Sequence, residues 1–281
     1  MSVRLLLRRA LIAAAFACVS TSSPAGLAAA FGAAGASEPT GSAAPDPGGP
    51  VVLELFTAQG CSSCPPADRV LSRLGLGVTT RARVVPLAFH VDYWNPVGWT
   101  DPFGAAEWSE RQGRYSRAFG VDGMYTPQLV VNGSAELNGA RELEALARIA
   151  EELKRPRAAS VSLTAREERG GRPALAVDVA AEVHERIEDA DKLQLFVAVF
   201  ENGLITPVAR GENHGRTLEN DFVVRRLEKA VSLEPKPGAR AHKSLTLKLD
   251  AEWKLENTGV AAFLQDPRSM RIHAAAARPV R

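Results

Sequence analysis

The feature that most constrains the fold is a pair of cysteines, Cys61 and Cys64, which lies between a buried strand and the start of a helix. Residues 51–57 (VVLELFT) are short, apolar and rich in strand-forming side chains, which predicts the buried strand. Pro65 and Pro66 can occupy the first turn of the helix, where no backbone N–H donor is needed. A cysteine at this end of a helix faces unpaired N–H groups, which favour its thiolate over its thiol form.

Two thiols in this setting suit thiol–disulfide exchange. We expect Cys61, on the loop side of the helix start, to be the exposed nucleophile. Cys64, one turn into the helix, is expected to be the less accessible thiol that resolves a mixed disulfide. The expected partners are therefore the thiols and disulfides of proteins or peptides.

Three other interpretations of the same cysteines stay open. The first is an inert structural disulfide, and the second is a non-catalytic module that only binds a partner. The third is a periplasmic copper-binding or copper-delivery protein, because copper(I) prefers soft thiolates and accepts few ligands. His90, at the end of a second predicted strand, would complete a copper site with Cys61 and Cys64, or would simply bond to backbone there.

The N-terminus is typical of an export signal. Three arginines within the first nine residues precede an uncharged run at 10–19, and small residues gather at 28–30 as at a cleavage site. The apolar run is shorter than the roughly 20 residues needed to cross a bilayer. We expect residues 1–30 to be a signal peptide that is removed. Residues 31–50, rich in alanine, glycine, serine and proline, are expected to form a flexible leader.

Removal of the signal is expected to leave a soluble periplasmic or secreted protein. Cys18 lies in the signal region, where lipidation is the alternative, so the mature chain keeps only the C-x-x-C pair. Such a pair can persist as a disulfide outside the cytoplasm. The formal net charge of +2, with no basic run in the mature part, gives no indication of nucleic-acid binding. No phosphate-cradling glycine motif is present, so we expect no organic cofactor.

Alternating strands and helices are predicted between residues 51 and 155. Such an order favours an α/β domain with a mixed sheet covered by helices. Leu143, Leu146, Ile149 and Leu153 mark the expected apolar face of the last helix. After the first strand, the expected order is helix 65–74, strand 83–91, helix 105–119, strand 128–132, strand 135–138 and helix 141–154.

Pro156 marks the expected start of a second domain, over residues 156–281. Its pattern changes to short strands without convincing helices, which is typical of an all-β sandwich. The polar segment 211–216 (GENHGR) is interpreted as a connecting loop, with contact to a partner as the alternative. The expected strands are 160–165, 174–183, 193–201, 204–210, 222–233, 242–249, 260–265 and 271–276.

Longer motifs carry a resemblance to a known family. LELFTAQGCSSCPPAD, HVDYWNPVGWTDPF and YTPQLVVNG resemble the bacterial secreted family called domain of unknown function 1223, and GENHGRTLENDFVVR resembles its C-terminal half. The resemblance covers nearly all of the mature chain. Residues 51–155 also resemble the thioredoxin-like superfamily, because Thr126-Pro127 stands just before a predicted strand after the second helix.

The resemblance to thioredoxins implies roles for two further residues. Pro127 matches the proline whose cis peptide bond lies opposite the cysteine pair and shapes the substrate groove. Glu54 matches a buried carboxylate that relays the proton of the resolving cysteine, unless it points to solvent from a strand edge. Trp94, Trp99 and Trp108 fall close together and predict either a groove for a peptide substrate or packing between domains.

Overall fold

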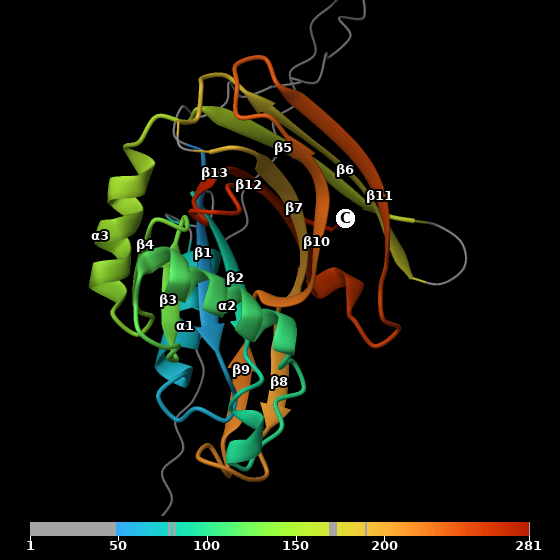
Figure 1. The fold of residues 1–281 in the computed structure, drawn as a ribbon. Helices are drawn as coiled ribbons and strands as arrows, with labels where there is room; N and C mark the ends of the chain where they lie inside the picture. Colours follow the sequence, from blue (N-terminus) through green and yellow to red (C-terminus); the bar gives the residue numbers. More distant parts are fainter. Residues whose placement is uncertain (1–48, 78–79, 81–82, 169–172, 189, 281) are drawn as a thin grey trace, which may run out of the picture. The chain divides into compact units, whose positions relative to one another are not determined.

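The structure is a computed structural model that describes residues 49–77, 80, 83–168, 173–188 and 190–280 (Figure 1). The predicted signal peptide, with Cys18, lies outside these residues, as does the predicted leader apart from Gly49 and Pro50. Within the described part, no helix is both long enough and apolar enough to cross a membrane.

The first part of the described chain alternates strands and helices in the predicted order. Every residue of the first two strands is buried, which explains why their sequences are predominantly apolar. Pro65 and Pro66 occupy the first turn of the first helix, as predicted, and Gly120 ends the second helix in the left-handed conformation, at φ 66°. The elements are β1 (Val51–Thr57), α1 (Pro65–Leu76), β2 (Val84–His90), a short 3-10 helix (Asn95–Val97), α2 (Ala106–Phe119), β3 (Gln128–Val131), β4 (Ala135–Asn138) and α3 (Glu142–Leu153).

One large mixed sheet of eight strands, in the order β13-β12-β7-β10-β2-β1-β3-β4, contains strands from both halves of the chain (Figure 1). β1 pairs in parallel with β2 and antiparallel with β3. The two halves meet where β10 pairs in parallel with β2, at Val223 and Ala88. There the Ala88 N–H donates to the Phe222 carbonyl oxygen at 2.8 Å. The second half contributes β7 (Leu193–Glu201), β10 (Val223–Leu233), β12 (Thr258–Gln265) and β13 (Ile272–Pro279).

A second sheet of three strands, in the order β11-β6-β5, packs against the second half of the large sheet. Its strands are β5 (Ala159–Glu167), β6 (Ala174–Val183) and β11 (Arg240–Lys248). Leu163 and Val179 share one apolar core with Val197 and Val260 of β7 and β12. The division of the chain at Pro156 stays a prediction about folding units, because strands from both sides of it share the large sheet.

A two-stranded hairpin projects from the second half, formed by β8 (Leu204–Pro207) and β9 (Thr217–Asn220). The sequence predicted a longer strand over 204–210 and no strand at β9. The residues of β9 alternate between exposed and buried, and the two buried ones are Leu218 and Asn220. The segment that joins β8 to β9 includes the polar residues 211–216.

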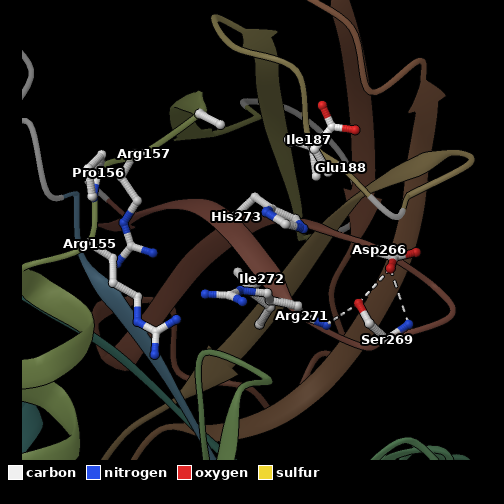
Figure 2. A pocket seen from close by; sticks show the side chains of 11 residues that line it. Arg155, Pro156, Arg157, Ile187, Glu188, Asp266, Ser269, Arg271, Ile272 and His273 are labelled. Atoms are coloured by element: carbon white, nitrogen blue, oxygen red, sulfur yellow. Dashed lines mark hydrogen bonds between the residues drawn. The ribbon is translucent and has the colours of Figure 1, made fainter.

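A cavity of 360 Å³ lies beside β13, where arginine side chains gather (Figure 2). Among them, Arg271 and Arg157 oppose a charged form of the nearby His273. Burial and these positive charges lower the pKa of His273 to about 4. The lining residues, which are all in the described part of the chain, include no cysteine: Arg155, Pro156, Arg157, Ala158, Ile187, Glu188, Asp266, Ser269, Arg271, Ile272 and His273.

Candidate functional site

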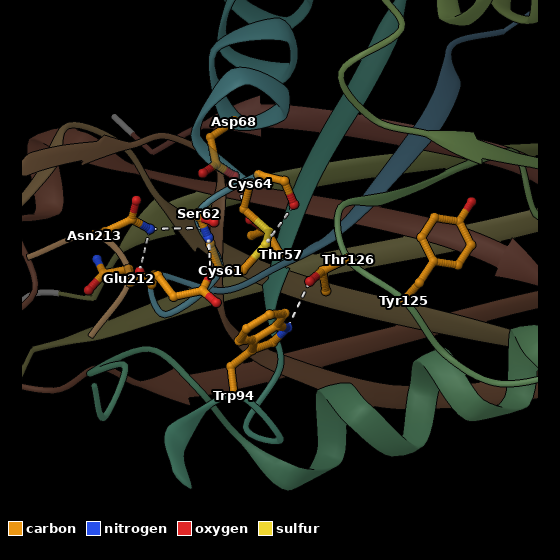
Figure 3. Close-up of a disulfide and its surroundings, with 12 residues drawn as sticks. Thr57, Cys61, Ser62, Cys64, Asp68, Trp94, Tyr125, Thr126, Glu212 and Asn213 are labelled. Atoms are coloured by element: carbon orange, nitrogen blue, oxygen red, sulfur yellow. Dashed lines mark hydrogen bonds between the residues drawn. A yellow bond between two sulfur atoms is a disulfide. The ribbon is translucent and has the colours of Figure 1, made fainter. Parts of the chain in front are cut away.

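Cys61 and Cys64 form a disulfide at the N-terminus of α1 (Figure 3). Cys64 is the N-cap residue, and its carbonyl oxygen accepts the N–H groups of Ala67 at 2.8 Å and Asp68 at 3.1 Å. Cys61 lies in the preceding turn, where its N–H donates to the Ala58 carbonyl oxygen at 3.2 Å. The buried strand and the proline-initiated helix therefore place both cysteines as the sequence predicts.

The prediction that Cys61 is exposed is wrong for the disulfide form of the protein. Cys61 and Cys64 are both 0% exposed, whereas Ser62 and Ser63 between them are exposed. The sequence could not indicate this burial, because the loops that pack around the cysteines come from distant parts of the chain.

One of these loops carries two of the predicted tryptophans. The Trp94 indole N–H donates to the Thr126 hydroxyl at 2.8 Å, and the Trp99 indole N–H donates to the Gln59 side chain at 3.1 Å. Thr126–Pro127 is a cis peptide bond, as predicted, and Thr126 lies among the residues around the disulfide (Figure 3). Trp108 is separate from this group, because its ring packs edge-on against Phe89 in the core.

The other loop is the polar segment 211–216, which the sequence predicted to be a connector. Asn213 is fully buried, and its side-chain amide donates to the carbonyl oxygens of Gln59 at 2.8 Å and Cys61 at 2.9 Å. The Glu212 carboxylate accepts the Ser62 N–H at 2.9 Å (Figure 3). This loop thus bonds directly to the cysteine motif, from about 150 residues away in the sequence.

A buried group of ionisable side chains lies at the carboxyl ends of β1 and β2. Asp101 holds His90, with 2.7 Å between the His90 Nδ1 and Asp101 Oδ2 atoms, and also accepts the Gln59 N–H. Burial disfavours the charged forms of both side chains, but the attraction between His90 and Asp101 has the larger effect on their pKa values. It raises the pKa of His90 and lowers the pKa of Asp101. The contact between the two side chains therefore favours the ionic form of the pair.

Asp68 is the buried carboxyl that lies nearest in sequence to the cysteines. It follows Cys64 by four residues, and both lie on helical backbone, so their side chains occupy neighbouring positions on one face of α1. The Thr57 hydroxyl donates to its Oδ1 atom at 2.7 Å. Burial raises the pKa of Asp68 to about 6, although His90 and Thr57 act in the opposite direction.

Glu54 does not occupy the position that the resemblance implied. Its carboxylate is buried on the α2 side of β1, where Arg111 binds it at 2.5 Å and the Tyr115 hydroxyl donates to it. Side chains alternate between the faces of a strand, so Glu54 and Thr57 point to opposite faces. Since Thr57 faces Asp68 of α1, the role of a buried acid beside Cys64 falls to Asp68 and not to Glu54.

The described residues contain no group of three or more histidine, cysteine, aspartate or glutamate side chains placed to hold a metal ion. In the disulfide form, Cys61 and Cys64 present no thiolates, and the Nδ1 atom of His90 is occupied by Asp101. The three-ligand copper site Cys61, Cys64 and His90 is therefore not assembled in this structure.

The sequence profile of a family described as a protein of unknown function (DUF1223) matches residues 52–265. The chain belongs to this family. The match includes the cysteine motif and the loop at 211–216, so the contacts between them lie within the family region of this DUF1223 protein. No curated protein matches the chain.

Two solved structures share the fold over most of the length of this DUF1223 protein. A crystal structure of a protein from Agrobacterium tumefaciens is 28% identical, covers 81% of this chain and 92% of its own, and superposes with a TM-score of 0.58. The protein HBP35 of Porphyromonas gingivalis is 16% identical, with coverage of 83% and 75% and a TM-score of 0.57. At 16% identity, the second likeness shows the fold alone.

Sequence reasoning missed three residues of the site: Asp68, Glu212 and Asn213. Asp68 could have been found from its spacing, because it stands four residues after Cys64 in a predicted helix. Glu212 and Asn213 carry no local signal that connects them to the cysteines.

Proposed function

We propose that this DUF1223 protein is an exported thiol–disulfide oxidoreductase with a thioredoxin-like domain. The observation that carries the proposal is the disulfide between Cys61 and Cys64 at the N-terminus of α1, with a buried acid one turn further on. The element order over β1 to α3 and the mixed sheet support a thioredoxin-like domain. The predicted signal peptide supports export to the periplasm or the exterior.

The reaction exchanges one disulfide for another. A substrate thiolate attacks the Cys61 Sγ atom, the Sγ–Sγ bond breaks, and Cys64 leaves as a thiolate that takes up a proton. A second substrate thiolate then attacks the substrate sulfur of the mixed disulfide and releases Cys61. The substrate leaves as a disulfide, and the protein gains two electrons and two protons as thiols. The same steps in reverse reduce a substrate disulfide.

Asp68 is suited to supply the proton that Cys64 needs. With a pKa near 6, its carboxyl is a proton donor of moderate strength close to the leaving thiolate. The Thr57 hydroxyl fixes the carboxyl, and the charged His90 nearby stabilises the carboxylate that remains. In the reverse direction, the Asp68 carboxylate accepts the proton of Cys64 as that thiol attacks.

The expected substrates are protein or peptide segments that carry the reacting thiols. The half-buried Trp94, which donates to the Thr126 hydroxyl, provides an apolar side chain among the residues around the disulfide (Figure 3). Because Cys61 is covered in the disulfide form, a substrate must displace the side chains that cover the sulfur.

Equilibration with glutathione redox buffers tests this proposal. The folded protein is expected to pass reversibly between its disulfide and dithiol forms. After acid quenching and alkylation, mass spectrometry gives the number of alkylated cysteines and so the fraction of each form. A Cys61→Ser/Cys64→Ser double variant is the control and should show no alkylation at either buffer extreme. A disulfide that stays intact in the folded protein under excess thiol would overturn the proposal in favour of an inert structural bond.

A further inference from the structure

The polar segment 211–216 carries a charged side chain to the cysteine motif, and its backbone is built for that position. Gly211 and Gly215 adopt φ values of +77° and +79°, which side-chain-bearing residues rarely adopt. A Cβ atom on Gly211 would also lie 3.2 Å from the Trp99 Cβ atom. The Arg216 guanidinium donates to the Asn213 Oδ1 atom at 2.9 Å, which orients the Asn213 amide toward the cysteine loop.

The hairpin that carries this segment is itself attached to the cysteine loop. The Gln59 side-chain amide donates to the Thr206 hydroxyl at 3.0 Å and to the Asn220 Oδ1 atom at 3.1 Å, so it contacts both β8 and β9. With the two bonds from Asn213, the hairpin is fixed to residues 59–61 at several points. The fold therefore holds the backbone at Glu212 beside the motif, and the Glu212 side chain makes the contact with Ser62.

The Glu212 carboxylate occupies a donor that a Cys61 thiolate would use. The Ser62 N–H is the first peptide donor after Cys61, in the turn that precedes α1, and a hydrogen bond from a peptide N–H favours the charged form of a neighbouring thiolate. Here Glu212 accepts that N–H at 2.9 Å. Hydrogen bonds from Ser62 lower the pKa of Glu212, so the carboxylate is negatively charged at neutral pH.

We infer that Glu212 is a positioning residue that makes the reduction potential of the Cys61–Cys64 pair more negative. A Cys61 thiolate exists only after the disulfide is reduced, and the adjacent carboxylate repels it and withholds the Ser62 N–H from it. The disulfide carries no charge and is not repelled. Glu212 therefore favours the disulfide over the dithiolate and raises the pKa of the Cys61 thiol, against the opposite effect of the α1 N-terminus.

The inference rests on the proposed redox function and deepens it. A more negative potential makes the reduced pair a better electron donor, so it points toward the reduction of substrate disulfides as the favoured direction. The electrons for each cycle would come from an external dithiol that reduces the Cys61–Cys64 disulfide by the same exchange.

The test compares Glu212→Gln with the wild type in glutathione redox buffers. Glutamine can still accept the Ser62 N–H but carries no charge. The variant should favour the dithiol by about tenfold, which corresponds to about 30 mV, and its Cys61 thiol should ionise at lower pH. The matched control is Glu219→Gln, which removes the same charge from an exposed site on β9 of the same hairpin. This control should leave the disulfide–dithiol equilibrium and the ionisation of the Cys61 thiol unchanged.

The salt dependence of the reduction potential is a second readout, which would not be affected if Glu212 had only a structural role. Glu212 is exposed, so its influence should be screened at high ionic strength, and the wild-type potential should approach that of Glu212→Gln. Equal exchange constants for wild type and Glu212→Gln at low salt would overturn this inference alone. A disulfide that exchanges with glutathione in no variant would instead overturn the proposed function, and the inference with it.

Discussion

The carboxyl of Asp68 follows Cys64 by one turn of α1, and the Asp68 N–H donates to the Cys64 carbonyl oxygen at 3.1 Å. Burial raises the pKa of this carboxyl from 3.8 to about 6. The same group that is suited to donate a proton to Cys64 therefore also destabilises the fold when it is ionised.

Asp68→Asn is expected to stabilise the disulfide form at neutral and alkaline pH. Because the folded pKa is raised, the wild type keeps its full stability below pH 3.8 and loses part of it as the pH rises through about 6. The difference between the unfolded and folded pKa values of Asp68 corresponds to about 3 kcal/mol in the free energy of unfolding. Urea unfolding at pH 4 and pH 8 measures it, and the gain should be much larger at pH 8 than at pH 4. The same gain at both pH values would contradict the raised pKa.

Glu54→Gln is expected to destabilise the fold without changing thiol chemistry. The substitution leaves the buried Arg111 guanidinium without its charged partner, which costs about 3 to 5 kcal/mol. The matched control is Glu142→Gln, which breaks the exposed pair with Arg73 and should cost at most about 1 kcal/mol. Denaturant unfolding measures both. A change in the thiol pKa of Cys64 in Glu54→Gln would restore the proton-relay role to Glu54.

Asn213→Ala is expected to loosen the cover of the disulfide. The carbonyl oxygens of Gln59 and Cys61 would lose their buried donor, at a cost of about 1 to 3 kcal/mol. The disulfide should then react faster with a small thiol such as dithiothreitol at a protein concentration where the variant is folded. His214→Ala, at the adjacent exposed position, is the control. Equal reduction rates in all three proteins would show that the loop does not limit access to Cys61.

The sequence predicts those parts of the molecule that depend on local pattern. The apolar run of β1, the prolines that start α1 and the glycine that ends α2 are each visible within a few residues, and the structure has these elements where they were expected. The disulfide follows from the C-x-x-C spacing in the same way.

Contacts between distant segments are not visible in local pattern. The predicted apolar face of α3 is right for Ile149, which is buried, and for Leu153, which packs against the core. It is wrong for Leu143, which is 85% exposed, and the buried face includes Ala145 and Glu152 instead. Glu152 is held inward by the Asn132 amide at 3.0 Å and the Ser134 hydroxyl at 2.8 Å, which set the rotation of the helix. The contact between Glu212 and Ser62 and the pairing of β10 with β2 depend on tertiary packing in the same way.

The most direct test of the account is the trapping of mixed disulfides by single cysteine variants. Cys61 lies in the turn before α1, where we expect a substrate to reach it by displacing the side chains that cover it, whereas Cys64 lies at the start of α1, one turn before Asp68. Cys64→Ser should therefore accumulate disulfide-linked partners through Cys61, because the thiol that resolves them is missing. Cys61→Ser should accumulate few or none.

Non-reducing gels of the two variants, expressed at native level in the source organism, make the measurement, with the double variant as the background. Partners trapped by Cys64→Ser and released by dithiothreitol, with little above background for Cys61→Ser, are the predicted result. Equal trapping by both variants would contradict the assignment of Cys61 as the attacking thiol. No trapped species in either variant would contradict the oxidoreductase function itself.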